Sequence, residues 1–198
     1  MNRKLRAIDL TLAGMFVALM AVGANITSFV PFLVIGGVPI TLQTFFAILA
    51  GAILGSRIGA ISMTVYALVG LVGVPVFARF GAGFSSIFSP TFGFILSYIL
   101  TAYITGKIIQ KHKGIKAYVV AALAGMVFNY VAGTNWMYAA YKLWAQAPDG
   151  LSYGLVWSWM LVPLPKDIIL AVCAGIMAHR LEKTVLSKST FRNVNRAA

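Results

Sequence analysis

The chain has 198 residues, of which 60% are apolar and only 10% are charged. A soluble domain carries about 25% charged residues, so this composition leaves no polar shell for a water-soluble core. The formal net charge of +12 comes from basic residues that flank apolar stretches rather than forming a stripe on a soluble surface. This pattern argues against a nucleic-acid-binding protein.

The apolar stretches predict a single all-α membrane domain with six transmembrane helices. The expected helices cover approximately residues 7–25, 41–54, 60–74, 92–109, 118–144 and 168–181. The second and third stretches are short and are separated by GSRIG, which predicts a tight turn. Residues 185–198 are polar and basic, and they form a tail after the last helix.

Three irregular connectors lie on one side of the predicted bundle, at residues 26–40, 74–93 and 145–166. The first is apolar but interrupted by proline and glycine, so it is expected to pack over the protein rather than face lipid. A ligand site is expected on this side, because only these connectors supply enough irregular backbone to line a cavity.

Thirteen of the sixteen Lys and Arg residues fall on the side opposite the connectors. Cytoplasmic loops of membrane proteins carry such an excess, so both termini are predicted to be cytoplasmic. Arg79, Lys142 and Lys166 are the exceptions. They suit an anionic ligand, or they act as anchors whose charged ends reach the membrane surface.

Asp167 opens the last predicted helix, directly after the residues PLPK. It is either an N-terminal cap, which accepts hydrogen bonds from free backbone N–H groups, or a ligand-binding carboxylate that faces a cavity. Gly14 and Ala18, four residues apart on the first helix, allow close helix approach. They either pack inside the bundle or dock against a partner subunit.

No motif for nucleotide binding, metalloprotease chemistry or intramembrane serine proteolysis occurs in the chain. The sequence therefore predicts neither an enzyme nor a resident metal, and any ATP-driven activity requires another subunit. The single cysteine, Cys173, excludes an intrachain disulfide.

The blocks VPITLQT, LVGLVGVPVFA and PTFG together resemble the BioY family, the biotin-specific S components of energy-coupling-factor (ECF) transporters. The resemblance extends from the first predicted helix through PLPKDIILAV. It implies a six-helix subunit of a prokaryotic cell membrane that binds biotin from outside with high affinity and needs no cofactor. It also implies that transport requires a transmembrane coupling (T) subunit, to which the first helix docks through Gly14 and Ala18, and two cytoplasmic ATPases.

The resemblance and the chemistry of biotin nominate one set of ligand-contacting residues. Asp167 is expected to accept from the ureido N–H groups, Arg79 or Lys166 to meet the carboxylate, and the remaining members to bind the ureido carbonyl or cover the apolar body. The set comprises Thr41, Gln43, Phe77, Arg79, Asn129, Tyr130, Trp136, Lys166 and Asp167.

One position departs from the family pattern, in which Pro-Gly-Asp is followed by a lysine three residues after the aspartate. Here Lys166 replaces the glycine and Leu170 stands where the lysine is usual. A residue directly before Asp167 is expected to point elsewhere on a helix. Three further interpretations remain: an S component for another vitamin, a self-sufficient ion-coupled carrier, and a structural membrane protein without a small ligand.

Overall fold

The computed structural model describes residues 6–26, 34–35 and 38–184, and within these ranges the chain is almost entirely α-helical. The elements are α1 (Ala7–Asn25), β1 (Val34–Ile35), β2 (Val38–Pro39), α2 (Gln43–Leu71), η2 (Ala78–Phe80), η3 (Phe84–Phe88), α3 (Phe92–Lys111), α4 (Ile115–Leu143), α5 (Tyr153–Met160) and α6 (Leu164–Thr184). The two short strands pair antiparallel. The predicted all-α class is confirmed, whereas the tail at 185–198 and most of the connector at 26–40 lie outside the described residues.

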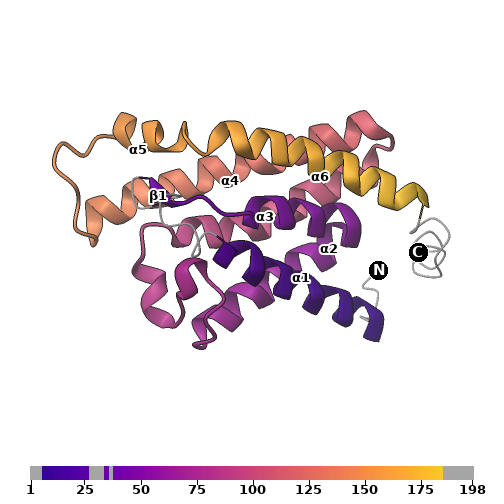
Figure 1. Cartoon of the computed structure of the whole chain (residues 1–198), viewed down its shortest axis with the longest axis horizontal. Coiled ribbons are helices and arrows are strands. Elements are labelled where there is room, and N and C mark those ends of the chain that lie inside the picture. The colour runs from indigo at the N-terminus through magenta and orange to yellow at the C-terminus, as the bar shows by residue number, and fades with distance from the viewer. Residues whose placement is uncertain (1–5, 27–33, 36–37, 185–198) are drawn as a thin grey trace.

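Helices α1 to α4 are each long and apolar enough to cross a membrane, and α5 and α6 form a further apolar pair bent by 52°. The first turn of α1 and the last turn of α6 lie at the same end of the bundle (Figure 1). The segments that contain η2, η3 and α5 lie at the opposite end. The connectors at residues 74–93 and 145–166 therefore lie at one end, as the sequence predicts.

The second and third predicted helices form one element, α2, which is broken at Gly55. Gly55 has φ 82° and ψ 172°, a left-handed backbone conformation that glycine adopts without steric cost. The two halves fold back on each other, because a Cβ on Gly59 would lie only 2.9 Å from the Cα of Gly51. The tight turn expected at GSRIG therefore exists, and each half is shorter than the roughly 20 residues of a straight transmembrane helix.

Small residues bring the helices of the bundle into backbone contact. A Cβ on Gly51 would lie 2.2 Å from the carbonyl oxygen of Ala102, so α2 and α3 touch directly at this point. Buried hydroxyls then link the helices: Thr101 and Thr105 of α3 donate to backbone carbonyls of α4, at 3.1 and 3.2 Å. Close approach and interhelical hydrogen bonds replace the hydrophobic driving force that is missing in lipid.

Candidate ligand-binding cavity

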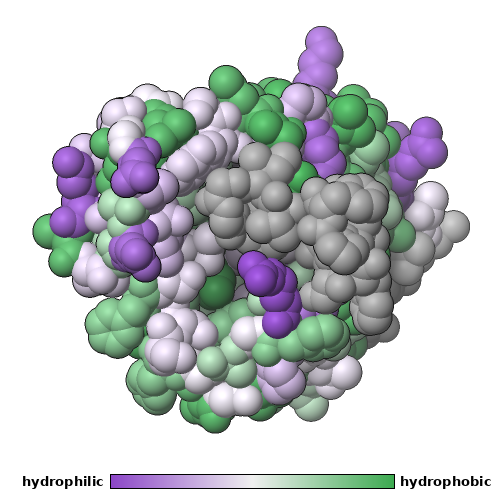
Figure 2. Space-filling view, turned by 60° about the vertical axis from the view of Figure 1, so that its left-hand side comes forward, coloured by the Kyte–Doolittle hydropathy of each residue, from purple (hydrophilic) through white to green (hydrophobic). Residues whose placement is uncertain are grey.

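A cavity of about 380 Å³ opens at the connector end of the bundle. This volume lies within the range of small-molecule sites, which begins at about 300 Å³. The starts of α2, α3 and α6, the middle of α4 and the η2–η3 segment all contribute to its wall. Figure 2 turns this end toward the viewer and shows a recess near the centre of the face, bordered by hydrophobic, weakly polar and strongly hydrophilic side chains.

Asp167 supplies the acidic group of the cavity. Its side chain is buried, and Oδ2 accepts a hydrogen bond of 2.6 Å from the hydroxyl of Tyr130 on α4. Oδ1 lies 2.8 Å from Nζ of Lys166, so the two side chains form an ion pair. No hydrogen bond to Oδ1 is found among the described side chains and backbone groups.

Asp167 is not the N-terminal cap of its helix. Helix α6 begins at Leu164, and the backbone N–H of Asp167 already donates to the carbonyl of Pro163 at 3.0 Å. The carboxylate therefore contacts Tyr130 and Lys166 instead of free N–H groups. The sequence allows Asp167 to be either an N-terminal cap or a carboxylate in a cavity wall, and the structure places it in the cavity wall.

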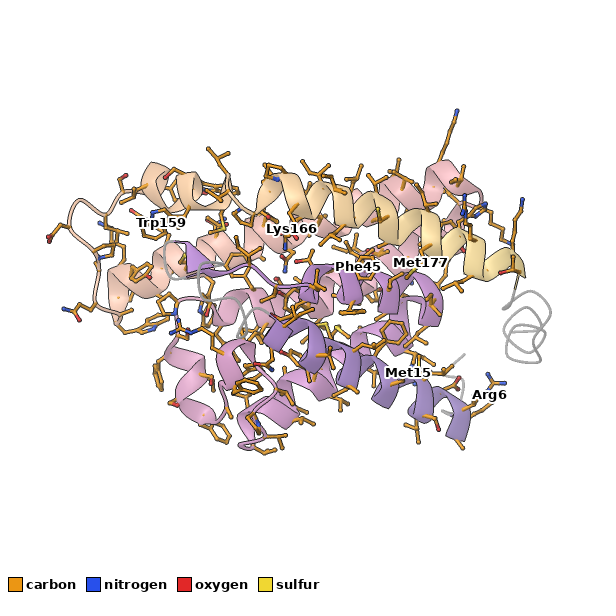
Figure 3. The ribbon with its side chains drawn as sticks, viewed as in Figure 1. Arg6, Met15, Phe45, Trp159, Lys166 and Met177 are labelled. Carbon is orange, nitrogen blue, oxygen red and sulfur yellow. The ribbon has the colours of Figure 1, made fainter. Side chains whose placement is uncertain are left out.

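Lys166 folds back into the cavity wall although it directly precedes Asp167. Its ammonium donates to the backbone carbonyl of Thr41 at 2.6 Å, which links the start of α6 to the start of α2. Figure 3 shows Lys166 pointing from α6 toward the interior of the bundle. The expectation that this residue points elsewhere is wrong, because a four-carbon side chain in the first turn of a helix reaches across to a neighbouring element.

Buried hydrogen bonds hold the other polar side chains of the cavity in place. Nε2 of Gln43 donates to the hydroxyl of Tyr66 at 2.8 Å, and that hydroxyl donates to the carbonyl of Val76 at 2.9 Å. Asn129 donates from Nδ2 to the hydroxyl of Ser97 at 2.6 Å. Because both side chains are already anchored, the cavity presents fixed polar atoms rather than mobile ones.

The segment after α2 contributes Phe77 and Arg79 to the wall. Phe77 is buried and packs edge-to-face against Tyr66, with ring centroids 5.6 Å apart. Gly70 is required beneath it, since a Cβ there would lie 2.1 Å from the Phe77 ring. Arg79 is exposed, and no described residue forms an ion pair or hydrogen bond with its guanidinium.

The structure places all but one of the predicted contact residues in the cavity wall. The residues that line it are Thr41, Gln43, Phe77, Arg79, Asn129, Tyr130, Lys166 and Asp167. Trp136 does not line it. Its ring packs behind Phe92, with centroids 6.1 Å apart, and its indole N–H points to the carbonyl of Ser89 at 3.4 Å, so it supports the wall from outside.

Sequence reasoning missed several wall residues, among them Thr44, Tyr98, Tyr141 and Met160. Tyr98 is buried on α3 beside the hydroxyls of Thr41 and Thr44. A polar aromatic residue in the middle of an apolar helix is a usable signal, because polar groups inside a membrane domain usually face its interior. Met160 carries no comparable signal.

Helix α1 presents Gly14 and Ala18 on its outer face. Both are exposed, and a Cβ on Gly14 would meet no described atom within 4 Å. Packing of this pair inside the bundle is therefore excluded for the described part of the chain. The face remains open to lipid or to another protein.

The fold and the cavity define a multi-pass helical membrane protein with a small-molecule site at one end of its bundle. A family model described as the BioY family matches residues 1–187, and the chain belongs to that family. It is 45% identical over 192 residues to the putative biotin transporter BioYB of Bacillus subtilis, a match that covers 96% of this chain and 95% of the relative. It is also 35% identical to the probable biotin transporter BioY of Pyrococcus horikoshii, which covers 90% of this chain and 98% of that protein.

A solved structure has the same fold. The crystal structure of the S-component for biotin from an ECF-type ABC transporter matches with a TM-score of 0.75 and 22% identity, covering 93% of this chain and 95% of that one. The predicted six-helix arrangement of the S-component type is confirmed by this match.

Proposed function

We propose that this chain is the biotin-binding membrane subunit, the S component, of an ATP-driven ECF vitamin transporter. The observation that carries the proposal is the buried Asp167 carboxylate in the cavity wall, whose Oδ1 is paired with the Lys166 ammonium at 2.8 Å and whose Oδ2 accepts from Tyr130. A buried carboxylate on the wall of a cavity in a membrane domain is suited to accept hydrogen bonds from a ligand. Membership of the BioY family and the names of its biotin-transporting relatives identify that ligand as biotin.

The ureido ring of biotin offers N–H donors that suit Asp167. One ureido N–H is expected to donate to Oδ1, while Tyr130 continues to occupy Oδ2. The ureido carbonyl needs a donor, and Gln43 retains a second proton on Nε2 after its bond to Tyr66. Tyr130 is less suited to this task because its proton is used by Asp167.

The remaining parts of biotin match the rest of the wall. Phe77, Phe92 and Met160 are buried and cover an apolar bicycle and chain. The carboxylate at the end of that chain is expected to meet Arg79, whose guanidinium can bind both oxygens at once. Lys166 is a weaker candidate for this role, since its ammonium is engaged by Thr41 and Asp167.

Transport would come from partner subunits. The open face of α1 at Gly14 and Ala18 is the proposed docking site for the T subunit, and two cytoplasmic ATPases would supply the energy. The described basic residues at the end opposite the cavity favour a cytoplasmic location for both termini in a prokaryotic cell membrane. They are Arg6, Arg57, Lys107, Lys111, Lys113, Lys116, Arg180 and Lys183. Biotin would therefore enter from outside.

Radiolabelled biotin binding to the purified chain tests the ligand, with thiamine and riboflavin as competitors. We expect saturable binding that unlabelled biotin displaces and the other two vitamins do not. Displacement by thiamine or riboflavin would favour an S component for another vitamin. Reconstitution in vesicles with and without the T subunit and ATPases tests the energy source, and uptake by the chain alone would favour an ion-coupled carrier.

The carrier alternative has weak structural support. Coupling to protons or sodium needs acidic groups inside the membrane domain, and within the described ranges Asp167 is the only carboxylate that lines the cavity. A structural protein without a ligand has no use for a cavity lined by a buried carboxylate. Both remain outcomes of the experiments above.

A further inference from the structure

The turn that carries Arg79 has an unusual backbone. Arg79 and Phe80 both have positive φ values, 60° and 56°. Two consecutive left-handed residues, neither of them glycine, are sterically unfavourable and persist only where surrounding contacts hold them. The N–H of Phe77 donates to the carbonyl of Gly81 at 3.0 Å, which closes the turn at its base.

Asn25, the last residue of α1, holds the tip of this turn. Its Oδ1 accepts a hydrogen bond of 2.6 Å from the backbone N–H of Phe80, fifty-five residues away in sequence. Its Nδ2 donates to the carbonyl of Ala21 at 3.0 Å. The donor on one side and the carbonyl on the other define the orientation of the amide, and the side chain is buried.

This bond bears directly on Arg79. The guanidinium of Arg79 forms no ion pair or hydrogen bond with a described residue, so it does not anchor the turn in this way. Arg79 lines the cavity with its backbone in the left-handed region. Asn25 contacts the peptide unit immediately after Arg79 and therefore sets the direction in which that side chain leaves the turn.

We propose that Asn25 is a positioning residue for Arg79 and thereby sets the preference of the site for a ligand with a carboxylate. This inference rests on the proposed function, in which Arg79 meets the carboxylate of biotin. Asn25 does not line the cavity and is not expected to touch the ligand. Its effect should therefore fall on the charged end of biotin and leave the ureido end unchanged.

The test compares the Kd of biotin with that of biotin methyl ester, which keeps the ureido ring but has no charge. Loss of a charge-assisted hydrogen bond weakens binding by about tenfold or more. We expect Arg79→Ala to raise the Kd of biotin by about this factor, which lowers the ratio of the ester Kd to the biotin Kd by the same amount. Asn25→Leu should lower this ratio similarly and leave the Kd of the ester unchanged.

A rescue variant separates positioning from general damage. Phe80→Gly relieves the positive φ at that residue, so the Asn25→Leu/Phe80→Gly double variant should recover part of the lost ratio. The exposed Asn135, whose Nδ2 bonds within α4, provides a control in which Asn135→Leu changes neither Kd. A wild-type ratio in Asn25→Leu, or equal weakening of both ligands, would overturn the inference. Failure of the wild-type chain to bind biotin would refute the proposed function instead.

Discussion

Substitution of Asp167 by asparagine is the most direct test of the proposed site. The change keeps the shape of the side chain but leaves one oxygen where the carboxylate has two. Tyr130 donates to Oδ2 at 2.6 Å, and the ureido N–H is expected to donate to Oδ1. An amide has a single acceptor oxygen, so one of these donors must lose its partner and face an N–H group.

The structure indicates the size of the effect. A hydrogen bond to a charged group contributes about 1.5–3 kcal/mol, which corresponds to roughly 10- to 150-fold in Kd. Loss of the contact with Lys166 should add little, because that side chain is about one-third exposed and keeps its bond to Thr41. We therefore expect Asp167→Asn to weaken biotin binding by about 10- to 150-fold.

Isothermal titration of biotin into the detergent-purified variant measures this change, and thermal unfolding checks that the variant folds. Asp149→Asn is the matched control, since Asp149 is exposed in the connector between α4 and α5 and should leave the Kd unchanged. An unaltered Kd in a well-folded Asp167→Asn variant would refute the role assigned to this carboxylate.

Three further outcomes are expected. Gly51→Ala places a methyl group 2.2 Å from a carbonyl oxygen of α3, so it should destabilise the bundle by about 1–3 kcal/mol in thermal or denaturant unfolding. Gly154→Ala is the control: its methyl group would have no described atom within 4 Å, so stability should not change. Gly14→Leu should leave biotin binding intact, because that face is open, but should prevent co-purification with the T subunit; retained co-purification would contradict docking there. Lys166→Met should change the Kd of biotin methyl ester and of biotin by the same factor, because its ammonium bonds Thr41 and Asp167; selective weakening of biotin would instead place Lys166 at the carboxylate.

Local features of the sequence were sufficient to predict the helical class. Apolar stretches of membrane length have few alternatives to a helix, because every backbone group in lipid must be hydrogen-bonded within the segment. The turn at Gly55 can also be predicted from local sequence, since glycine adopts a positive φ without steric cost. The family resemblance and the chemistry of biotin together nominated nine residues, and eight of these line the cavity.

The direction in which a side chain points cannot be predicted from local sequence. Lys166 was expected to point away from Asp167, yet its ammonium lies 2.8 Å from Oδ1 because the start of α2 offers it a carbonyl. Trp136 was expected in the cavity, but Phe92 stands in front of it. In both cases the deciding neighbour comes from another element, and a helical pattern does not specify which element that is.

Hydropathy, charge and local motifs are enough to predict the helical class, the end of the bundle at which the described connectors lie, and the family. The hydrogen bond from Tyr130 to Asp167 and the one by which Asn25 holds the turn of Arg79 are visible only in the folded chain. Both bonds act over about 3 Å between residues that lie far apart along the chain. Their partners are defined only once the helices have packed.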